Sequence, residues 1–299
     1  AELNQSVIQP FWQNQVQKGS LQSSDGLTLA YSYVIPAQAK ATILLIQGRT
    51  ESMMKYHELM WELSQQGYAV FTMDHRGQGL SDRMLENREK GHVEKFQQYV
   101  DDQQFFINTV VLSKQTSGQL LLLTHSMGGA VGSLLLAQQP TLFKAAVLSS
   151  PMHLASALGW MCSDCFAGFV DVPYNETPFA ENVLTQSEVR YKAFRDQYRA
   201  LPKLQLGGPT WQWVNESCDI ADELPELAKN IQTPFLILQG TADTVVSNSA
   251  QDEFCESAGQ SCAGVVKVKD AMHELFIEKD VYRQQALTAL LGFFDKALK

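Results

Sequence analysis

Short apolar runs alternate with amphipathic segments along most of the chain. A strand buried on both faces of a parallel sheet reads as a continuous apolar run, whereas a surface helix places apolar residues every three or four positions. The runs predict strands at residues 41–46, 69–73, 120–123, 145–148, 235–238 and 265–268. The amphipathic segments predict helices over residues 56–63, 96–112, 248–256 and 282–297, and a segment of small and apolar residues predicts a helix over 127–138.

A hairpin precedes this alternation. Residues 19–34 contain two alternating segments separated by Asp25-Gly26, a strong turn signal. Parallel strands need crossover connections, which are usually helices. The chain therefore predicts an α/β fold, with a mostly parallel central sheet and helices on both of its faces.

The segment 152–228 interrupts the alternation and is rich in aromatic side chains. A structureless loop of that length is rare in a compact domain, so the segment predicts a largely helical cap subdomain. The core would then consist of residues 1–151 and 229–299. Ligands of open α/β sheets bind at the carboxyl ends of the strands, where such an insertion leaves the sheet. We therefore expect the cap to cover the site.

The charge balance narrows the choice of partners. The chain has 23 Lys and Arg against 32 Asp and Glu, a formal charge of −9. Nucleic-acid binding needs clustered Lys and Arg that displace counterions, so the balance argues against a nucleic-acid partner. It also argues against a strongly electrostatic membrane anchor.

One local group of cations departs from this balance. Lys192, Arg195 and Arg199 are spaced to share one face of a helix that Pro202 should end. Such a face either meets an anionic lipid surface, which would make a membrane a peripheral partner, or is an ordinary solvated face in an acidic neighbourhood.

The five cysteines, an odd number, do not resemble a disulfide framework in a chain with room for a large core. Cys162 and Cys165 form a C-x-x-C pair, but zinc would need a second pair or a nearby histidine pair. We therefore expect reduced packing cysteines and no metal. The first residues lack a signal-peptide pattern, and no apolar run reaches the length of a membrane span. These features predict a cytoplasmic location, either free or at the cytoplasmic face of the inner membrane.

Candidate chemistry begins at Ser126, where the predicted strand 120–123 leads into the predicted helix 127–138. A serine at a sharp strand-to-helix turn with small neighbours is typical of a nucleophile elbow, and Gly128 and Gly129 are such neighbours. The alternative is an ordinary helix N-cap serine. The strand–turn–helix context favours the nucleophile.

A serine hydroxyl needs a base to become a nucleophile. His273 follows the last predicted strand and Asp243 follows the strand before it, which gives the order Ser, acid, His along the chain. We therefore predict His273 as general base and Asp243 as the acid that orients it. Asp270 is the rival acid, but it is too near His273 in sequence to come from a different strand end. Three other histidines fit structural or cap positions: His75, His92 and His153.

An oxyanion hole needs two backbone amides aimed at the developing charge. The first candidate is the amide of Met127, directly after the nucleophile. The second is the amide of Arg49, in the loop after the predicted strand 41–46, where Gly48 permits a tight turn.

Motif strings extend these signals over most of the chain. They are Gly48-Arg49-x-Glu51-Ser52, Asp74-His75-Arg76-Gly77-Gln78-Gly79-x-Ser81, Gly91-His92-Val93, Tyr99-Val100-Asp101-Asp102, His125-Ser126-Met127-Gly128-Gly129, Asn182-Val183-Leu184-Thr185, Gly207-Gly208-Pro209-Thr210, His273-Glu274 and Glu278-Lys279-Asp280. On these strings the chain resembles the bacterial lysophospholipase L2 family, a relative of the monoacylglycerol lipases in the α/β-hydrolase superfamily. The turn at 74–81 would be structural, with Asp and Arg fixing the backbone.

The resemblance implies an α/β-hydrolase fold and hydrolysis of the single acyl ester of a lysophospholipid, without a metal or cofactor. The products would be a fatty acid and a glycerophospho-compound. A monoacylglycerol lipase or general carboxylesterase is the alternative within the same chemistry. A non-catalytic binding protein on the same scaffold is a third possibility, which the complete Ser, Asp and His set disfavours.

Two positions depart from the related lipases. Thr124 stands where the elbow usually has glycine, and Arg49 stands where enzymes of neutral glycerides keep a small residue. The Arg49 side chain would start beside the reacting ester, where a guanidinium can bind a substrate phosphate through charge-assisted hydrogen bonds. The alternative is that Arg49 pairs with Glu51 or a cap carboxylate and only holds the loop.

Overall fold

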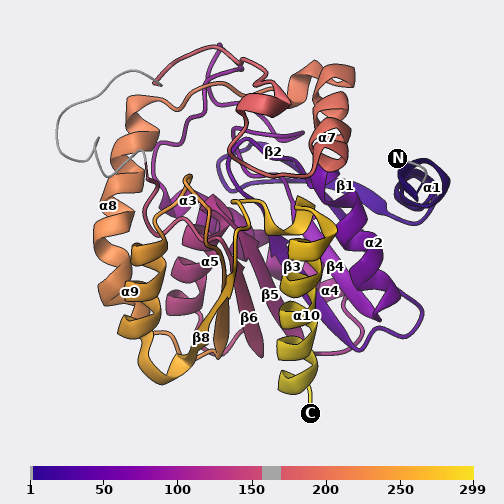
Figure 1. The fold of residues 1–299 in the computed structure, drawn as a ribbon, viewed down its shortest axis with the longest axis vertical. Helices are drawn as coiled ribbons and strands as arrows, with labels where there is room; N and C mark the ends of the chain where they lie inside the picture. The colour runs from indigo at the N-terminus through magenta and orange to yellow at the C-terminus, as the bar shows by residue number, and fades with distance from the viewer. Residues whose placement is uncertain (1–2, 157–169) are drawn as a thin grey trace.

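The computed structural model describes residues 3–156 and 170–299, and Figure 1 shows how they are arranged. In this part of the chain eight strands form one sheet, in the order β1-β2-β4-β3-β5-β6-β7-β8. The strands are β1 Gln17–Gln22, β2 Thr28–Val34, β3 Ala41–Ile46, β4 Tyr68–Met73, β5 Leu120–His125, β6 Ala145–Ser149, β7 Phe235–Gly240 and β8 Cys262–Val268.

The strands from β3 to β8 pair in parallel, and the hairpin of β1 and β2 adds an antiparallel edge next to β4. The predicted α/β fold with a mostly parallel sheet is therefore confirmed. The five strands from β3 to β7 are buried along their whole length, as their apolar runs indicate. The edge strand β8 is half exposed, so only its second half reads as an apolar run.

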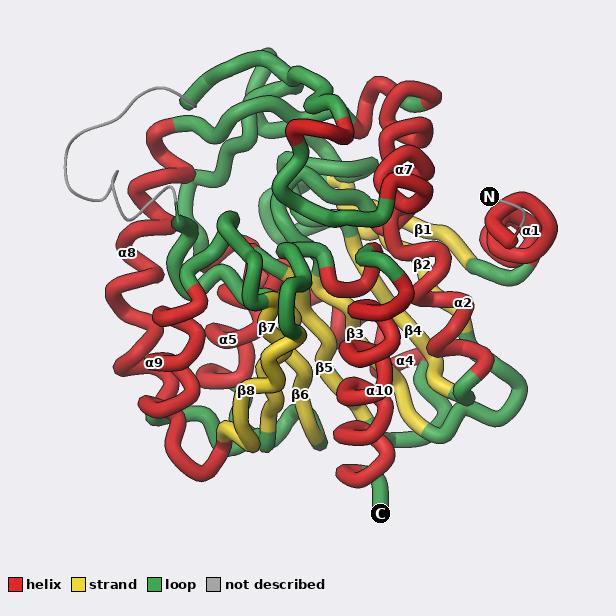
Figure 2. The backbone as a smooth tube through the Cα atoms, in the orientation of Figure 1, coloured by secondary structure: helices red, strands yellow, loops and turns green. Residues whose placement is uncertain are grey.

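Helices cover both faces of the sheet, as Figure 2 shows. One buried core contains side chains of α1 (Gln9–Asn14), α2 (His57–Gln65) and α10 (Asp280–Ala297). The other contains side chains of α3 (Gln97–Phe106), α5 (Met127–Gln138), α8 (Trp211–Ala228) and α9 (Asn248–Ala258). The predicted helix over 96–112 continues from α3 through a π-helical turn, Ile107–Val111, into α4 (Leu112–Lys114). None of the helices in the described residues has the length and apolarity to cross a bilayer.

The described part of the segment 152–228 contains α7 (Glu188–Ala200), α8 and long extended connections. Side chains of α7 form a small apolar cluster with Leu204 and with Ile277 of the core, and the hydroxyl of Tyr198 donates to the carbonyl of Thr50 in the loop after β3, at 2.6 Å. The helix α8 packs against α5 and α9 along the side of the core (Figure 1). We propose that the whole segment is one cap subdomain, which α8 fastens to the core.

The expectation of reduced cysteines is wrong for Cys255 and Cys262, which form a disulfide. The helix α9 ends at Ala258, and its C-cap Gly259, with a φ of 58°, lets the chain reverse through the 3-10 turn Gly259–Ser261 into β8. This reversal brings the two Cα atoms to 5.3 Å, a spacing at which a disulfide forms without backbone movement. Cys218 is also disulfide-bonded. The C-x-x-C pair lies outside the described residues.

Candidate active site

Ser126 joins β5 to α5 in a backbone conformation that few L residues adopt, with φ 53° and ψ −123°. Close packing goes with this bend. A side-chain carbon added at Gly128 would lie 2.3 Å from the carbonyl oxygen of Ile46, and one at Gly129 would lie 2.4 Å from Cβ of Pro151. Only glycine fits at either position, so α5 can begin close to β3 and leave Ser126 on the wall of a cavity.

Thr124, the departure from the usual elbow, is accommodated by the facing helix. A side-chain carbon added at Gly132 of α5 would lie 2.5 Å from Cγ2 of Thr124. The glycine that the elbow lacks in the strand is therefore supplied one helix away, and the strand keeps its regular pairing with β3 and β6 through Thr124.

His273 and Asp243 lie in the loops after β8 and β7, and both side chains are buried. Nδ1 of His273 is 2.7 Å from Oδ2 of Asp243. The other carboxylate oxygen accepts the amides of Val245 at 2.8 Å and Val246 at 3.2 Å, which fixes its orientation. The structure thus brings the predicted acid and base together, and His273 lines the same cavity as Ser126.

The loop after β3 lies beside the nucleophile. A side-chain carbon added at Gly48 would be 3.0 Å from Cβ of Ser126. Glu51 holds this loop, because its Oε2 accepts the amide of Gly48 at 2.6 Å. Met127 begins α5, where the first amides have no acceptor within the helix. Both predicted donor residues, Arg49 and Met127, are therefore neighbours of Ser126.

The turn at 74–81 is hydrogen-bonded to the loop after β3. The Asp74 carboxylate accepts the side-chain amide of Gln47 at 2.6 Å and the backbone amides of Met53 and Leu80 at 2.6 and 2.7 Å. These bonds tie the loop after β3 to the loop after β4. The geometry agrees with the structural role predicted for this turn.

The three histidines that the sequence places outside the site each lie close to a polar group of a neighbouring residue. His75 lies 2.9 Å from the carbonyl of Gln47, His92 lies 2.9 Å from the hydroxyl of Thr210, and His153 lies 3.0 Å from the hydroxyl of Ser133. Burial lowers the pKa of His75 to about 4 and that of His153 to about 3, so both are neutral near pH 7. The rival acid Asp270 is exposed to solvent.

The side chain of Arg49 leaves the loop toward the cap. Its Nη2 donates to the carbonyl of Gly207 at 2.8 Å, and its guanidinium carbon lies 5.1 Å from the ring centre of Trp213. Burial lowers the pKa of Arg49 to about 10. Among the described residues no carboxylate pairs with it, because Glu51 is bound to Lys55 instead. The alternative in which Arg49 pairs with Glu51 is therefore not what the structure shows.

A cavity of about 390 Å³ lies above Ser126, between the core and the cap. Its walls are mostly apolar, with Val245 and Val246 from the core and Met152, Leu184, Phe194, Leu206 and Trp213 from the segment 152–228. Pockets for lipid-like ligands have this character, an apolar wall with a few placed polar groups.

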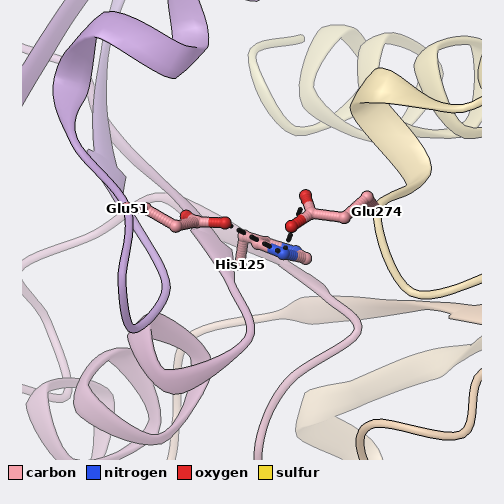
Figure 3. A group of neighbouring side chains, drawn as sticks. All are labelled: Glu51, His125 and Glu274. Atoms are coloured by element: carbon pink, nitrogen blue, oxygen red, sulfur yellow. Dashed lines mark ion pairs between the residues drawn. The ribbon is translucent and has the colours of Figure 1, made fainter. Parts of the chain in front are cut away.

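Sequence reasoning missed a buried cluster of four charged side chains, Glu51, Lys55, His125 and Glu274, which we call the Lys55 cluster. Nζ of Lys55 is 2.5 Å from Oε1 of Glu51 and also binds Oε1 of Glu274. Nε2 of His125 lies 3.1 Å from Oε2 of Glu274 and 3.6 Å from Oε1 of Glu51. Figure 3 shows the two glutamates reaching His125 from different segments. The cluster joins the loop after β3, the end of β5 and the loop after β8.

The charges of the Lys55 cluster stabilise one another. Burial lowers the pKa of His125, but the attraction of Glu274 and Glu51 outweighs it, and the net result is a raised pKa. Burial likewise raises the pKa of Glu274, yet Lys55 and His125 hold it well below its usual range. Glu51, His125 and Glu274 are ligand types that could hold a metal ion. The ammonium of Lys55 already lies against both carboxylates, so the cluster is complete without one.

The basic face predicted on α7 is divided between two roles. Lys192 pairs with Asp196 at 2.5 Å, and Arg199 pairs with the same carboxylate at 2.8 Å and with Glu176. Arg195 instead lines the cavity. The helix ends at Ala200, before Pro202, as expected.

A serine at a strand-to-helix elbow, with a His–Asp pair at the ends of the following strands, defines a serine hydrolase of the α/β-hydrolase fold. Residues 37–280 match the model of the family described as Serine aminopeptidase, S33. A monoglyceride lipase from Saccharomyces cerevisiae has a similar structure, with a TM-score of 0.75 and 20% identity over 95% of this chain and 94% of that one.

Two relatives are more similar in sequence. Lysophospholipase L2 of Escherichia coli (strain K12) is 35% identical over 85% of this chain and 80% of its own length. The probable lysophospholipase L2 of Haemophilus influenzae is 30% identical over 92% of this chain and 91% of its own. The chain therefore belongs to the S33 family of serine hydrolases and, within it, to the lysophospholipase L2 group.

Proposed function

We propose that the protein is a lysophospholipase that cleaves the acyl ester of a single-chain phospholipid through an acyl-enzyme. Ser126 attacks the ester carbonyl, and His273 takes its proton and later returns it to the leaving glycerol oxygen. Asp243 holds the imidazole in the required tautomer through the 2.7 Å contact with Nδ1. The amides of Met127 and Arg49 stabilise the oxyanion. A water then attacks the acyl carbonyl with His273 again as base, and the fatty acid leaves.

The observation that carries this proposal is the Arg49 guanidinium. It lines the cavity of Ser126, and no described carboxylate neutralises it. A buried cation without a counter-ion is costly unless a ligand supplies the charge. The phosphate of a lysophospholipid is separated from its ester by one glycerol unit, and the apolar walls suit the single acyl chain.

A monoacylglycerol lipase or general carboxylesterase is the alternative, favoured by the structural likeness to a monoglyceride lipase. It would use the same triad but would leave Arg49 without a role in substrate binding. An aminopeptidase, the activity in the family's description, would need a free carboxylate to bind the substrate ammonium. The carboxylates that line the described part of the cavity, Glu51 and Glu274, are both occupied by Lys55.

The predicted cytoplasmic location rests on the missing signal-peptide pattern, the missing membrane span and the expected reduced cysteines, and the Cys255–Cys262 disulfide removes the last of these supports. Disulfides persist in oxidising compartments. We propose that the protein works in such a compartment, in peripheral contact with the membrane that contains its substrate. Alkylation of free thiols in freshly lysed cells tests this location, because a cytoplasmic protein would be labelled at both cysteines.

Two measurements test the proposed activity. A fluorophosphonate probe should label Ser126 and so separate an enzyme from a binding protein. Rates on a lysophospholipid and a monoacylglycerol with the same acyl chain should then favour the lysophospholipid. An equal or higher efficiency on the monoacylglycerol would assign the alternative activity.

A further inference from the structure

Four side chains on the cavity wall have polar atoms that are buried without a hydrogen-bond partner. They are Nε of Arg49, Nε of Arg195, the hydroxyl of Tyr174 and Nε1 of Trp213. Buried polar groups in proteins are nearly always paired, and four donor groups left unpaired around one cavity indicate a ligand rich in acceptors.

The guanidinium groups of Arg49 and Arg195 and the hydroxyl of Tyr174 are connected through one segment of the cap. The carbonyl that accepts Nη2 of Arg49 belongs to Gly207, and a side-chain carbon added at Gly207 would be 2.8 Å from the amide nitrogen of Tyr174. Nη2 of Arg195 donates to the hydroxyl of Tyr191, which itself donates to the carbonyl of Thr177. The extended segment 174–177 therefore connects the two guanidinium groups.

The electrostatics of this region call for an anion. Arg195 rests on the rings of Tyr191 and Phe194, at 5.0 and 4.9 Å from their centres, and has no ion pair with a described carboxylate. The carboxylates on the cavity wall are held by Lys55. Two guanidinium groups and a phenol can together surround a tetrahedral anion, whose several oxygens accept from planar donors in pairs.

We propose that Arg195 and Tyr174, together with Arg49, form a subsite in the cap for the phosphate of the single-chain phospholipid. This inference rests on the proposed function and adds two specificity-determining residues to it. The acyl ester lies at Ser126, the phosphate lies against the cap donors, and the glycerol spans the distance between them. Arg195 is then a binding residue, although it belongs to a helix face whose other cations are solvated.

The first test compares two substrates in matched variants. Arg195→Gln and Tyr174→Phe remove the charge and the hydroxyl while keeping most of the side-chain volume. Each should lower kcat/KM for the lysophospholipid, by about 10- to 100-fold for Arg195→Gln and by about 5-fold for Tyr174→Phe. Hydrolysis of the monoacylglycerol should stay within about 2-fold. The control is Lys192→Gln, an exposed cation of the same helix, which should change neither rate. An equal loss on both substrates would overturn the subsite.

A second test does not depend on phospholipid turnover. Glycerol 3-phosphate should inhibit monoacylglycerol hydrolysis competitively in the wild type, and Arg195→Gln should weaken this inhibition by at least about 10-fold. Inorganic phosphate should inhibit less, since it lacks the glycerol. If glycerol 3-phosphate inhibits through Arg195 but the wild type cleaves only monoacylglycerol, the subsite stands and the proposed substrate fails. If the lysophospholipid is cleaved and inhibition ignores Arg195, the function stands and the subsite is overturned.

Discussion

Two groups of cations include residues that line the same cavity, and the groups differ in what neutralises their charge. Lys55 and His125 contact Glu51 and Glu274 in the Lys55 cluster, where every charge has an opposite neighbour. Arg49 and Arg195 contact carbonyl, hydroxyl and aromatic groups, but neither forms an ion pair with a carboxylate of the described residues. The paired cations therefore stabilise the fold, whereas the unpaired cations are available to bind an anionic ligand.

The paired and the unpaired cations also differ in position. The Lys55 cluster connects the loop after β3, the end of β5 and the loop after β8, so its pairs fix these segments relative to one another (Figure 3). The unpaired guanidiniums of Arg49 and Arg195 line the cavity between the core and the cap, so their missing partner can enter with the substrate. A paired cluster should therefore govern stability, and the unpaired cations should govern substrate choice.

The largest expected effect lies between the two regions, at the nucleophile. Ser126→Ala should lower turnover by up to about 10⁶-fold, and so should His273→Ala, while the double variant should be hardly worse. Asp243→Asn should cost about 10⁴-fold, because the imidazole loses its orienting partner. Steady-state rates measure all three. Near wild-type turnover in Asp243→Asn would mean that another carboxylate orients His273.

The same Ser126→Ala variant sharpens the comparison. It should still bind glycerol 3-phosphate with wild-type affinity in a calorimetric titration, because it alters neither the Lys55 cluster nor the cap cations. Lost affinity would place the phosphate at the nucleophile instead of the cap.

The next largest effect concerns stability. Lys55→Met leaves Glu51 and Glu274 buried without their cation and should lower the free energy of unfolding by about 3–5 kcal/mol. Urea unfolding at pH 7 measures this. Lys192→Met, which removes an exposed ion pair, should cost no more than about 0.5 kcal/mol. Losses of equal size in the two variants would show that the Lys55 cluster does not hold the loops together.

Much of the fold could be predicted because its strands are buried on both faces. The run at 120–123 and the small-residue helix after it fixed the position of the elbow, and α5 begins and ends where predicted. The apolar run predicts only residues 265–268 of the half-exposed β8, and the disulfide that joins α9 to β8 could not be predicted in this way. The pairing of Cys255 with Cys262 depends on a chain reversal at Gly259 that leaves no periodic signal.

The candidate site also contains residues that could be predicted from the sequence and residues that could not. Ser126, Asp243 and His273 could be predicted because each follows a strand, and parallel strands end at one edge of the sheet. The Lys55 cluster could not, because its members come from three segments far apart in the sequence and only Glu51 and Lys55 share a local spacing. A signal was available: His125 and Glu274 each stand next to a predicted catalytic residue, where a charged side chain is unusual unless it is paired.

A smaller effect is expected in the unpaired region. Arg49→Ala keeps the backbone amide but removes the guanidinium. The transition-state stabilisation measured by kcat/KM for the lysophospholipid should therefore fall by about 1.5–3 kcal/mol. The monoacylglycerol rate and the free energy of unfolding should change little, in contrast to Lys55→Met. Substrate-matched kinetics and urea unfolding of the same preparation test both halves. A loss shared by both substrates would mean that Arg49 holds its loop through Gly207 and does not bind phosphate.

The smallest effect is a dependence of stability on pH that only the paired region should show. Glu274 and Glu51 face His125 from two loops, Lys55 lies beyond them, and the ring of His273 is 4.8 Å away. The folded-state pKa of His125 is raised above 6.5, so its contribution to stability is complete below pH 6.5 and is lost as pH rises through the raised value.

The pKa of Glu274 is depressed below 4.5, so its contribution is complete above pH 4.5 and is lost only at more acidic pH. The wild type should therefore exceed His125→Gln in unfolding free energy by a constant amount between pH 4.5 and 6.5. Above that window the difference should shrink, by at most about 1.4 kcal/mol per pH unit. Urea unfolding at a series of pH values measures it, with Arg49→Ala as the variant that should show no such trend. A difference that grows with rising pH would mean that His125 is buried as a neutral ring and that the Lys55 cluster is paired through Lys55 alone.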